Sequence, residues 1–262
     1  MRTTADDRVN LLRDLRDGGV LRRTLSCLTA DNKHLKPSNI ILSELIEAPI
    51  GTWGLSFFVT EDANNPIFLA VTELMLVARR FYIGSSVHYD RQGELKMKFE
   101  SSVNDMSRWL HGFGYVGPVG VDVLETITTK INASASPGSV ESSSSQTKTQ
   151  IPSSRRKDSN FHIIDINCRT LGQLCLPLLR THFTSRGLVC AASFPIRILK
   201  TREQFIDLFE GDFVTGKICI LSWYDDPVSK VSVGNVVVGA EDPDRLGQYV
   251  QRIRKISQEI SF

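Results

Sequence analysis

Two apolar, β-branched runs that each carry one carboxylate constrain this chain most. Residues 119–124 contain Asp122, and residues 161–167 contain Asp165. Runs of this composition are typical of strands, and an isolated charge inside one is costly unless it is paired or bound to a metal. The two runs therefore predict a site built from paired acids. The alternative is that both acids face solvent on an open sheet, or pair with Arg169 for structural reasons.

Alternation along the second run places Asp165, Asn167 and Arg169 on one face of the expected strand. Carboxylate and amide oxygens from two neighbouring strands are the hard ligands that Mg²⁺ prefers. A nearby arginine suits a phosphoryl or carboxylate group. The residues alone thus predict a site for Mg²⁺ and an anionic ligand.

The first half of the chain predicts a helical segment followed by a β-meander. We expect a helix over residues 6–29, strands over 38–46, 53–60, 67–72 and 74–78, a loop over 81–86, and a helix over 101–113. Trp53, Trp109 and Trp223 are expected in the core.

The second half predicts a helix over residues 171–185, with Leu174, Leu178 and Phe183 as candidate core positions. A short strand is expected over 197–200, and further strands over 218–223 and 231–238. Thr201 and Gln204 have the spacing of a capping box at a helix start. Asp242 followed by Pro243 predicts the start of a final helix that runs to about residue 257.

Residues 133–157 differ in composition from the rest, because serine, proline, glycine and threonine dominate them. Such a segment buries too little apolar surface to offset its ordering entropy. We expect a disordered insertion over about 126–159 within one domain, with an interdomain linker as the alternative. The basic triplet at 155–157 is expected to be a solvated loop end; a localisation signal or a nucleic-acid contact is the alternative.

Composition excludes several classes of protein. The net charge of +2 over 262 residues gives no reason to expect nucleic acid or a membrane as partner. No apolar run reaches the length of about 18 residues that a membrane span needs. The five cysteines show no paired spacing, which favours reduced thiols and a cytoplasmic location. Neither a histidine zinc spacing nor a Gly-x-Ser-x-Gly elbow occurs.

At these residues the chain resembles the ATP-grasp superfamily, most of all its carboxylate–amine ligases. The similarity runs from about Ser38 to the end and is greatest to stand-alone ATP-grasp proteins of fungal secondary-metabolite biosynthesis. It is carried by the segments at 41–44 and 68–73, by the glycine-rich entry into the strand with Asp122 at 114–122, and by the segment at 164–170.

The resemblance implies an α+β fold, namely ATP-grasp C-terminal subdomains with a mostly antiparallel sheet and packed helices. It implies ATP and Mg²⁺ (or Mn²⁺) as cofactors, small-molecule carboxylate and amine substrates, and an acyl-phosphate intermediate. Asp122, Asp165 and Asn167 match the metal ligands of the family. Arg169 matches the arginine that contacts phosphoryl or carboxylate oxygens, and Glu44 falls near the hinge strand that contacts adenine and ribose.

The sequence departs from the family at two points. Asp165 stands where the family more often has glutamate. The family's phosphate-contacting lysines and glycine-rich loop should precede Ser38, where residues 1–37 offer one helical segment, so we expect an N-terminally truncated chain. The expected division is therefore a helical segment at 1–37 and an ATP-grasp-like region at 38–262. An inactive ATP-grasp remnant that acts as a partner or regulatory subunit is the alternative to an active ligase.

Overall fold

The computed structural model describes residues 49–77, 81–127 and 159–257, together with seven isolated positions nearer the N-terminus (9, 10, 13, 17, 19, 45 and 46). Residues 38–44 of the strand predicted at 38–46, including Glu44, most of the helix at 6–29, and residues 128–158 of the predicted insertion are not described, and residues 45 and 46 carry no strand assignment. The fold is therefore that of the region from Pro49 onward.

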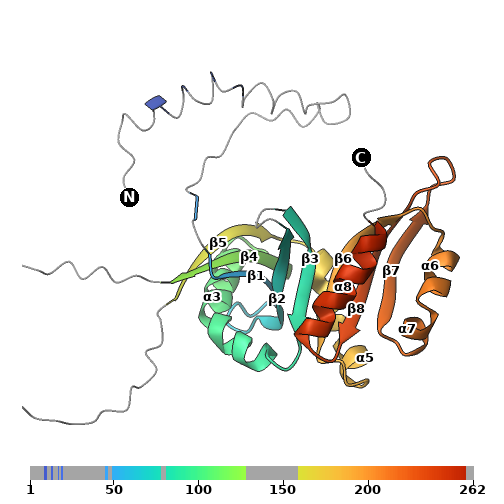
Figure 1. Ribbon diagram of the computed structural model, residues 1–262. Helices are drawn as coiled ribbons and strands as arrows, with labels where there is room; N and C mark the ends of the chain where they lie inside the picture. The colour runs from blue at the N-terminus through green and yellow to red at the C-terminus, as the bar shows by residue number, and fades with distance from the viewer. Residues whose placement is uncertain are drawn as a thin grey trace, which may run out of the picture. The chain divides into compact units, whose positions relative to one another are not determined.

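This region is an α+β fold built on one sheet (Figure 1). The strands are β1 (Gly51–Val59), β2 (Ile67–Val77), β3 (Phe81–His88), β4 (Gly117–Ile127), β5 (Ser159–Asn167), β6 (Cys190–Ile198), β7 (Ile218–Asp225) and β8 (Ser232–Ala240). The helices are α3 (Gln92–Gly112), η2 (Gly172–Leu174), α4 (Cys175–Leu178), α5 (Arg180–Thr184), α6 (Arg202–Leu208), α7 (Glu210–Val214) and α8 (Pro243–Ser257). The strand order is β5-β4-β1-β2-β3-β6-β8-β7, and the pairings between neighbours are antiparallel. The predicted class and antiparallel sheet are confirmed.

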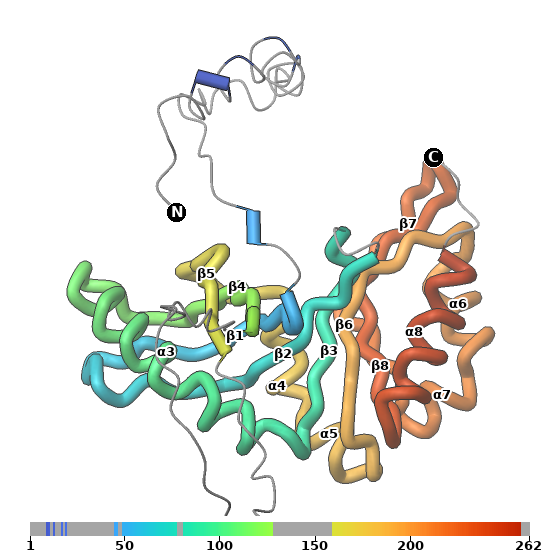
Figure 2. The backbone as a smooth tube through the Cα atoms, turned by 60° about the vertical axis from the view of Figure 1, so that its left-hand side comes forward, coloured from blue at the N-terminus to red at the C-terminus, as the bar shows by residue number. Residues whose placement is uncertain are grey.

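One face of the sheet, here called the helical face, is covered by the longer helices (Figure 2). Leu95 and Phe99 of α3 pack with Leu55 and Val121 of β1 and β4 in one buried cluster. Helix α8 packs on β6 and β8 in a second cluster, to which α6 contributes Phe205. Because side chains alternate along a strand, the residues between these core positions point to the opposite face.

The opposite face, here called the acidic face, is covered by helices over only part of its width. Leu176 of α4 and Phe183 of α5 pack with Val87 and Val237 in a third cluster, over β3 and β8. The part of this face formed by β5, β4 and β1 lies beyond these short helices. It carries Asp122, and it is the surface on which the candidate site lies.

Strands β4 and β5 are paired neighbours, with Ile127 opposite Ser159. Residues 128–158 therefore connect adjacent strands of the same sheet. Loop closure entropy grows only with the logarithm of loop length, about 0.6 kcal/mol per doubling, so a connection of this length is compatible with the pairing.

The loop expected over residues 81–86 is wrong, because this segment is the interior strand β3. Its small residues are needed where neighbouring backbone comes close. A Cβ at Gly84, whose φ is +148°, would lie 2.4 Å from the carbonyl oxygen of Ser193 on β6. Ser85 is fully buried. Close packing between strands thus requires small residues such as glycine and serine at these positions. The same residues are typical of loops, which is why the sequence pattern indicated a loop here.

Three other expectations are corrected by the structure. The runs at 67–72 and 74–78 form one strand, β2, with an irregularity after Met75. The helix expected at 101–113 begins nine residues earlier, at Gln92. The strand expected at 197–200 is the end of β6, whose small residues Cys190, Ala191 and Ala192 pair with β3 and β8.

The single helix expected over 171–185 is divided into η2, α4 and α5. Pro177 lies inside this stretch and cannot donate the backbone hydrogen bond that a continuous helix needs. Phe183 is fully buried as expected, whereas Leu178 is 73% exposed. Trp109 is also exposed, against its expected core position, and stacks edge-on against Phe113 at the surface.

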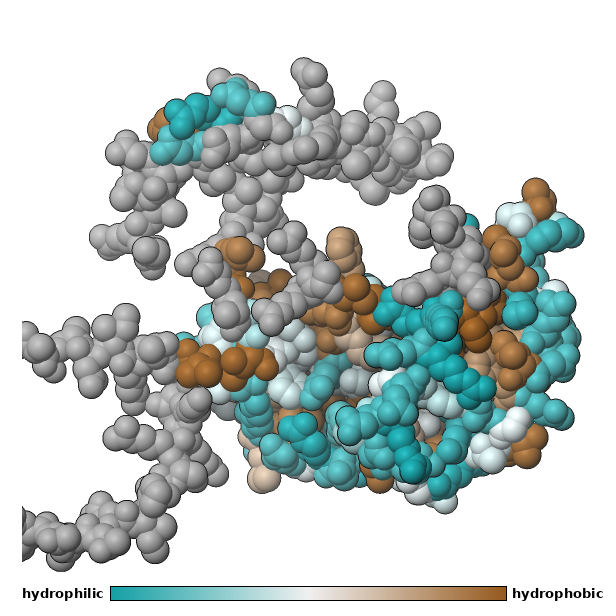
Figure 3. Space-filling view, viewed as in Figure 1, coloured by the Kyte–Doolittle hydropathy of each residue, from teal (hydrophilic) through white to brown (hydrophobic). Residues whose placement is uncertain are grey.

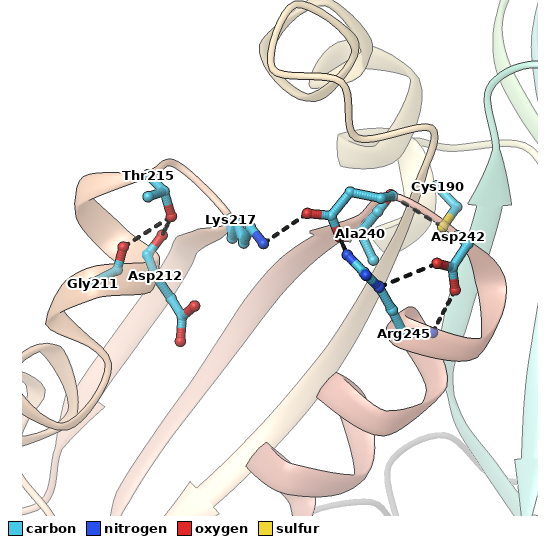
Figure 4. A network of polar contacts seen from close by, with 9 residues as sticks. Cys190, Gly211, Asp212, Thr215, Lys217, Ala240, Asp242 and Arg245 are labelled. Atoms are coloured by element: carbon cyan, nitrogen blue, oxygen red, sulfur yellow. Dashed lines mark hydrogen bonds and ion pairs between the residues drawn. The ribbon is translucent and has the colours of Figure 1, made fainter.

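The start of α8 follows the predicted cap. The Asp242 carboxylate accepts a 2.7 Å hydrogen bond from the backbone N–H of Arg245, and the Arg245 side chain pairs with the same carboxylate (Figure 4). Lys217, at the entry to β7, donates to Glu241 at 2.8 Å. These contacts fix the helix start against the ends of β7 and β8.

The β7 edge carries apolar surface at the hairpin that joins it to β8 (Figure 3). Val228 in the connecting turn is 89% exposed, and Tyr224 on β7 is 61% exposed. Among the described residues, no helix is both long and apolar enough to cross a membrane.

Replacing Thr201 with alanine is expected to destabilise the protein by about 1 kcal/mol. The Thr201 hydroxyl accepts from the backbone N–H of Gln204, and the Gln204 side chain accepts from the backbone N–H of Thr201, so the predicted capping box is confirmed. Urea denaturation measures the change. Thr201→Ser keeps the hydroxyl and is the control; equal stability of the alanine and serine variants would contradict the assignment.

Candidate metal centre

Asp122 and Asp165 face each other across neighbouring strands. Their Cα atoms are register partners in the β4–β5 ladder. Val121 and Val123, on either side of Asp122, belong to the core under α3, so Asp122 and its cross-strand partner lie on the acidic face. The sequence therefore predicted correctly that these two acids come together.

Asp122 and Asp165 belong to a row that continues across the sheet. Asp122 is the register partner of Gly54 on β1, and Gly54 is the partner of Thr72 on β2. Adjacent strands lie about 4.8 Å apart, so four neighbouring positions on one face share a narrow strip of surface. Gly54 contributes no side chain of its own to that strip, directly beside Asp122.

The two carboxylates lack a cationic partner in the part of the chain that the structure describes. Burial raises the pKa of Asp122 above its ordinary value, and the negative charge of Asp165 raises that pKa further. Like charges placed directly opposite each other on a sheet are destabilising. The pair is therefore electrostatically unsatisfied and favours a cation or a shared proton.

Asn167 follows Asp165 on the same face, opposite Gly120. Its side-chain N–H donates a 2.7 Å hydrogen bond to the Asp165 carboxylate. This bond orients Asp165 and leaves the amide oxygen of Asn167 available for another contact. The structure thus brings together the three residues that the sequence singled out as metal ligands.

These residues fit a magnesium ion by their donor chemistry. Two carboxylates and one amide oxygen are hard ligands, and Mg²⁺ is commonly held by one or two carboxylates together with water and substrate phosphates. Within the described ranges, no group of three or more His, Cys, Asp or Glu side chains could hold a metal by itself. The site therefore matches an ion that is shared with a bound phosphate better than a closed structural site.

Arg169 does not continue the face of β5, because the strand ends at Asn167 and residues 168–169 form a bend. The prediction that strand alternation places Arg169 on the same face as Asp165 is therefore wrong. The guanidinium group is exposed and donates to the carbonyl oxygen of Thr170 at 3.4 Å. The alternative in which Arg169 pairs with the two acids is not seen either. Glu44 lies outside the described residues.

The chain after β5 turns back over the acidic face, which the sequence did not indicate. A Cβ at Gly120 would lie 1.5 Å from a Leu171 methyl carbon, so the Leu171 side chain occupies the place above Gly120. In the same way Gln173 occupies the place above Gly54. Glycines at 54 and 120 thus make room for the segment that follows the predicted site.

A cavity of about 640 Å³ lies elsewhere, between β2, β3 and α8. Glu73, Met75 and His88 contribute to its lining, and none of the site residues does. Glu73 packs on the helical face, so this cavity and the acidic pair lie on opposite sides of the sheet.

No family model matches the chain, and no curated protein matches it. Solved structures do match. The phosphoribosylaminoimidazole carboxylase ATPase subunit from Aquifex aeolicus shares 12% identity over 82% of this chain and 58% of its own, with a TM-score of 0.43. Biotin carboxylase from Campylobacter jejuni shares 10% identity over 82% of this chain and 47% of its own, with a TM-score of 0.42. L-amino acid ligase from Bacillus licheniformis shares 8% identity over 81% of this chain and 54% of its own, with a TM-score of 0.41.

This chain spans about half the length of these three structures. At these identities and TM-scores the likeness assigns no ligand, residue or reaction to this chain.

Proposed function

We propose that the protein is an ATP- and Mg²⁺-dependent carboxylate–amine ligase that acts through an acyl phosphate on small-molecule substrates, in natural-product biosynthesis. The observation that carries the proposal is the cross-strand pair of Asp122 and Asp165 on the acidic face, without a cationic side chain among their described neighbours. The resemblance of the segments around both residues to ATP-grasp ligases supplies the reaction.

The roles of the residues follow from their chemistry. Asp122 and Asp165 would hold Mg²⁺ or Mn²⁺, with the amide oxygen of Asn167 as a third ligand. The ion, when bound, would neutralise phosphate oxygens during phosphoryl transfer. Arg169 would stabilise the charge on the transferring group, since its guanidinium is exposed and its planar fork of N–H donors suits phosphoryl oxygens. Glu44 would contact the adenosine part of the nucleotide.

Calorimetric titration with ATP, in Mg²⁺ and then in EDTA, tests the first half of the proposal. We expect binding that depends on the divalent ion, because the acidic pair repels phosphate unless a cation lies between them. Trapping with hydroxylamine across a panel of carboxylates then tests for an acyl phosphate.

A folded chain that binds ATP in neither condition would overturn the ligase and favour the inactive remnant. Binding without hydroxamate formation for any carboxylate would restrict the function to nucleotide binding. Binding that is equally strong in EDTA would show that the acidic pair is not the cation site.

A further inference from the structure

Two buried glutamines, both in helices that pack on the sheet, have different hydrogen bonding. Gln92 is 7% exposed, and its side chain is fully used. Its oxygen accepts from the backbone N–H of Val71 at 2.9 Å, and its nitrogen donates to the carbonyl oxygens of Val71 and His88. Gln92 therefore has a structural role, tying the start of α3 to the edges of β2 and β3.

Gln173, in η2, is 6% exposed and is only partly satisfied. Its oxygen accepts a 3.3 Å hydrogen bond from the Ser85 hydroxyl, which is itself 3.0 Å from the Tyr82 hydroxyl. Its nitrogen, Nε2, is buried and has no hydrogen-bond partner among the described residues. Buried donors are nearly always paired in folded proteins, so an unpaired one calls for an explanation.

The place of this side chain supplies the explanation. A Cβ at Gly54 would lie 2.6 Å from Nε2 of Gln173, so the carboxamide lies over Gly54. Gly54 is the register partner of Asp122. The unpaired donor of Gln173 therefore lies one strand away from the Asp122 carboxylate, in the row that also contains Asp165.

Asp122, one strand away, is a candidate acceptor for this donor. It is half-buried, and it accepts no hydrogen bond from any residue in the described ranges. The Ser85 hydroxyl, on β3, fixes the oxygen of the Gln173 carboxamide. The planar amide then keeps its N–H groups for another acceptor.

We propose that Gln173 is a positioning residue of the acidic site, whose side-chain N–H donates to the Asp122 carboxylate and holds it in place for a divalent cation. The role of the cation in this inference rests on the proposed function, whereas the hydrogen bond between Gln173 and Asp122 does not depend on it. It gives Gly54 a purpose, since only a residue without a side chain leaves room for the carboxamide beside Asp122.

Side-chain NMR of the whole chain without added metal tests the hydrogen bond. We expect Asp122→Ala to shift the Gln173 side-chain NH₂ signals and to speed their hydrogen exchange about tenfold or more. Asp165→Ala, one strand farther away, is expected to have a smaller effect. Unchanged Gln173 signals in Asp122→Ala would overturn the proposal, whatever the protein binds.

Thermal unfolding separates a positioning role from a structural one. Gln173→Met is expected to lower the Tm by less than Gln92→Met does, because it removes one hydrogen bond to the Asp122 carboxylate and leaves no backbone group without a partner. Gln92→Met, the matched control, is expected to lower the Tm by about 5 °C or more, because it leaves backbone groups of Val71 without partners. A loss of Tm in Gln173→Met as large as that in Gln92→Met would show a structural role and overturn the proposal.

Mn²⁺ binding, followed by electron paramagnetic resonance, tests the link to the cation. Loss of an outer-shell partner typically weakens metal affinity 10- to 100-fold, so we expect Gln173→Met to weaken Mn²⁺ binding about tenfold. Gln173→Glu cannot donate and is expected to weaken it too. Tighter binding by Gln173→Glu would make residue 173 a direct ligand and overturn the positioning role. Wild-type protein that binds no Mn²⁺ but shows the NMR response would overturn the proposed function and leave the hydrogen bond standing.

Discussion

Asp165→Asn is expected to raise the stability of the metal-free protein while abolishing its response to Mg²⁺. In the wild type, Asp165 lies directly opposite Asp122, and no lysine or arginine among the described residues pairs with either. Removing one of two like charges in a cross-strand pair relieves a repulsion of about 0.5 kcal/mol. The asparagine keeps the size of the side chain but contributes no charge to a bound cation.

Urea denaturation measures both effects when it is carried out without Mg²⁺ and with a saturating concentration of Mg²⁺, on the order of 10 mM. A ligand that binds only the folded state stabilises it by an amount that grows with the logarithm of its concentration, so wild-type stability should rise with Mg²⁺. For Asp165→Asn we expect a higher starting value and no rise, and an ATP affinity at least 100-fold weaker. We expect the same signs for Asp122→Asn.

Asp207→Asn is the matched control, because it makes the same change of charge on the exposed surface of α6. It should leave the Mg²⁺ response as in the wild type. If Asp165→Asn lowered the stability of the metal-free protein, the two acids would already be satisfied. If it kept the Mg²⁺ response, the ion would bind elsewhere.

The sequence predicted the centre of this site because the signal was local. A single charge in each of two β-branched runs, read with strand alternation, was enough to place Asp122 and Asp165 on one face. Strand termination set the limit of that argument. Alternation was carried on to Arg169, but β5 ends at Asn167, where the chain bends back over the sheet.

The parts that the sequence did not predict depend on contacts between distant segments. Nothing near Gly54 indicates that a glutamine more than a hundred positions later will lie above it. Likewise, the small residues of β3 look like a loop until β6 lies beside them and excludes a Cβ at Gly84. Composition reports what one segment prefers, whereas these residues were selected by what packs against them.

Glu125 is another residue whose surroundings depend on contacts between distant segments. Its ion pair gives the largest loss of stability that we expect from a single substitution. Glu125 is three residues after Asp122 on β4, so alternation places it on the helical face, opposite to the face of Asp122 and Leu124. It is 5% exposed. Its carboxylate accepts from the Trp53 indole N–H at 2.9 Å and from Lys98 of α3 at 2.7 Å. The Lys98 ammonium also lies 4.8 Å from the centre of the Trp53 ring. The second acid of β4 is thus buried with a partner from a helix that local sequence does not place beside it.

Lys98→Met is therefore expected to destabilise the protein by about 3 kcal/mol at pH 7, because it leaves the buried Glu125 charge without its counter-charge. Methionine keeps the length of the side chain and its packing against the aromatic rings. Arg108→Met, which removes the exposed ion pair with Asp105, is the control and should cost less than about 1 kcal/mol. Urea denaturation at pH 7 compares the two.

The pH dependence of this difference gives an independent check. Burial acts to raise the pKa of Glu125, but hydrogen bonds from Lys98, Ser159 and Trp53 and the charge of Lys98 together hold it below its ordinary value. A carboxyl group whose pKa is lowered by folding contributes stability above its unfolded pKa, about 4.3, and that contribution is lost as the pH falls through the folded pKa. In Lys98→Met, Glu125 can take up a proton at a higher pH than in the wild type, which removes its unpaired buried charge. The stability gap between wild type and variant should therefore narrow from pH 7 toward pH 3; a gap that is constant over this range would show that Lys98 acts through packing and not through its charge.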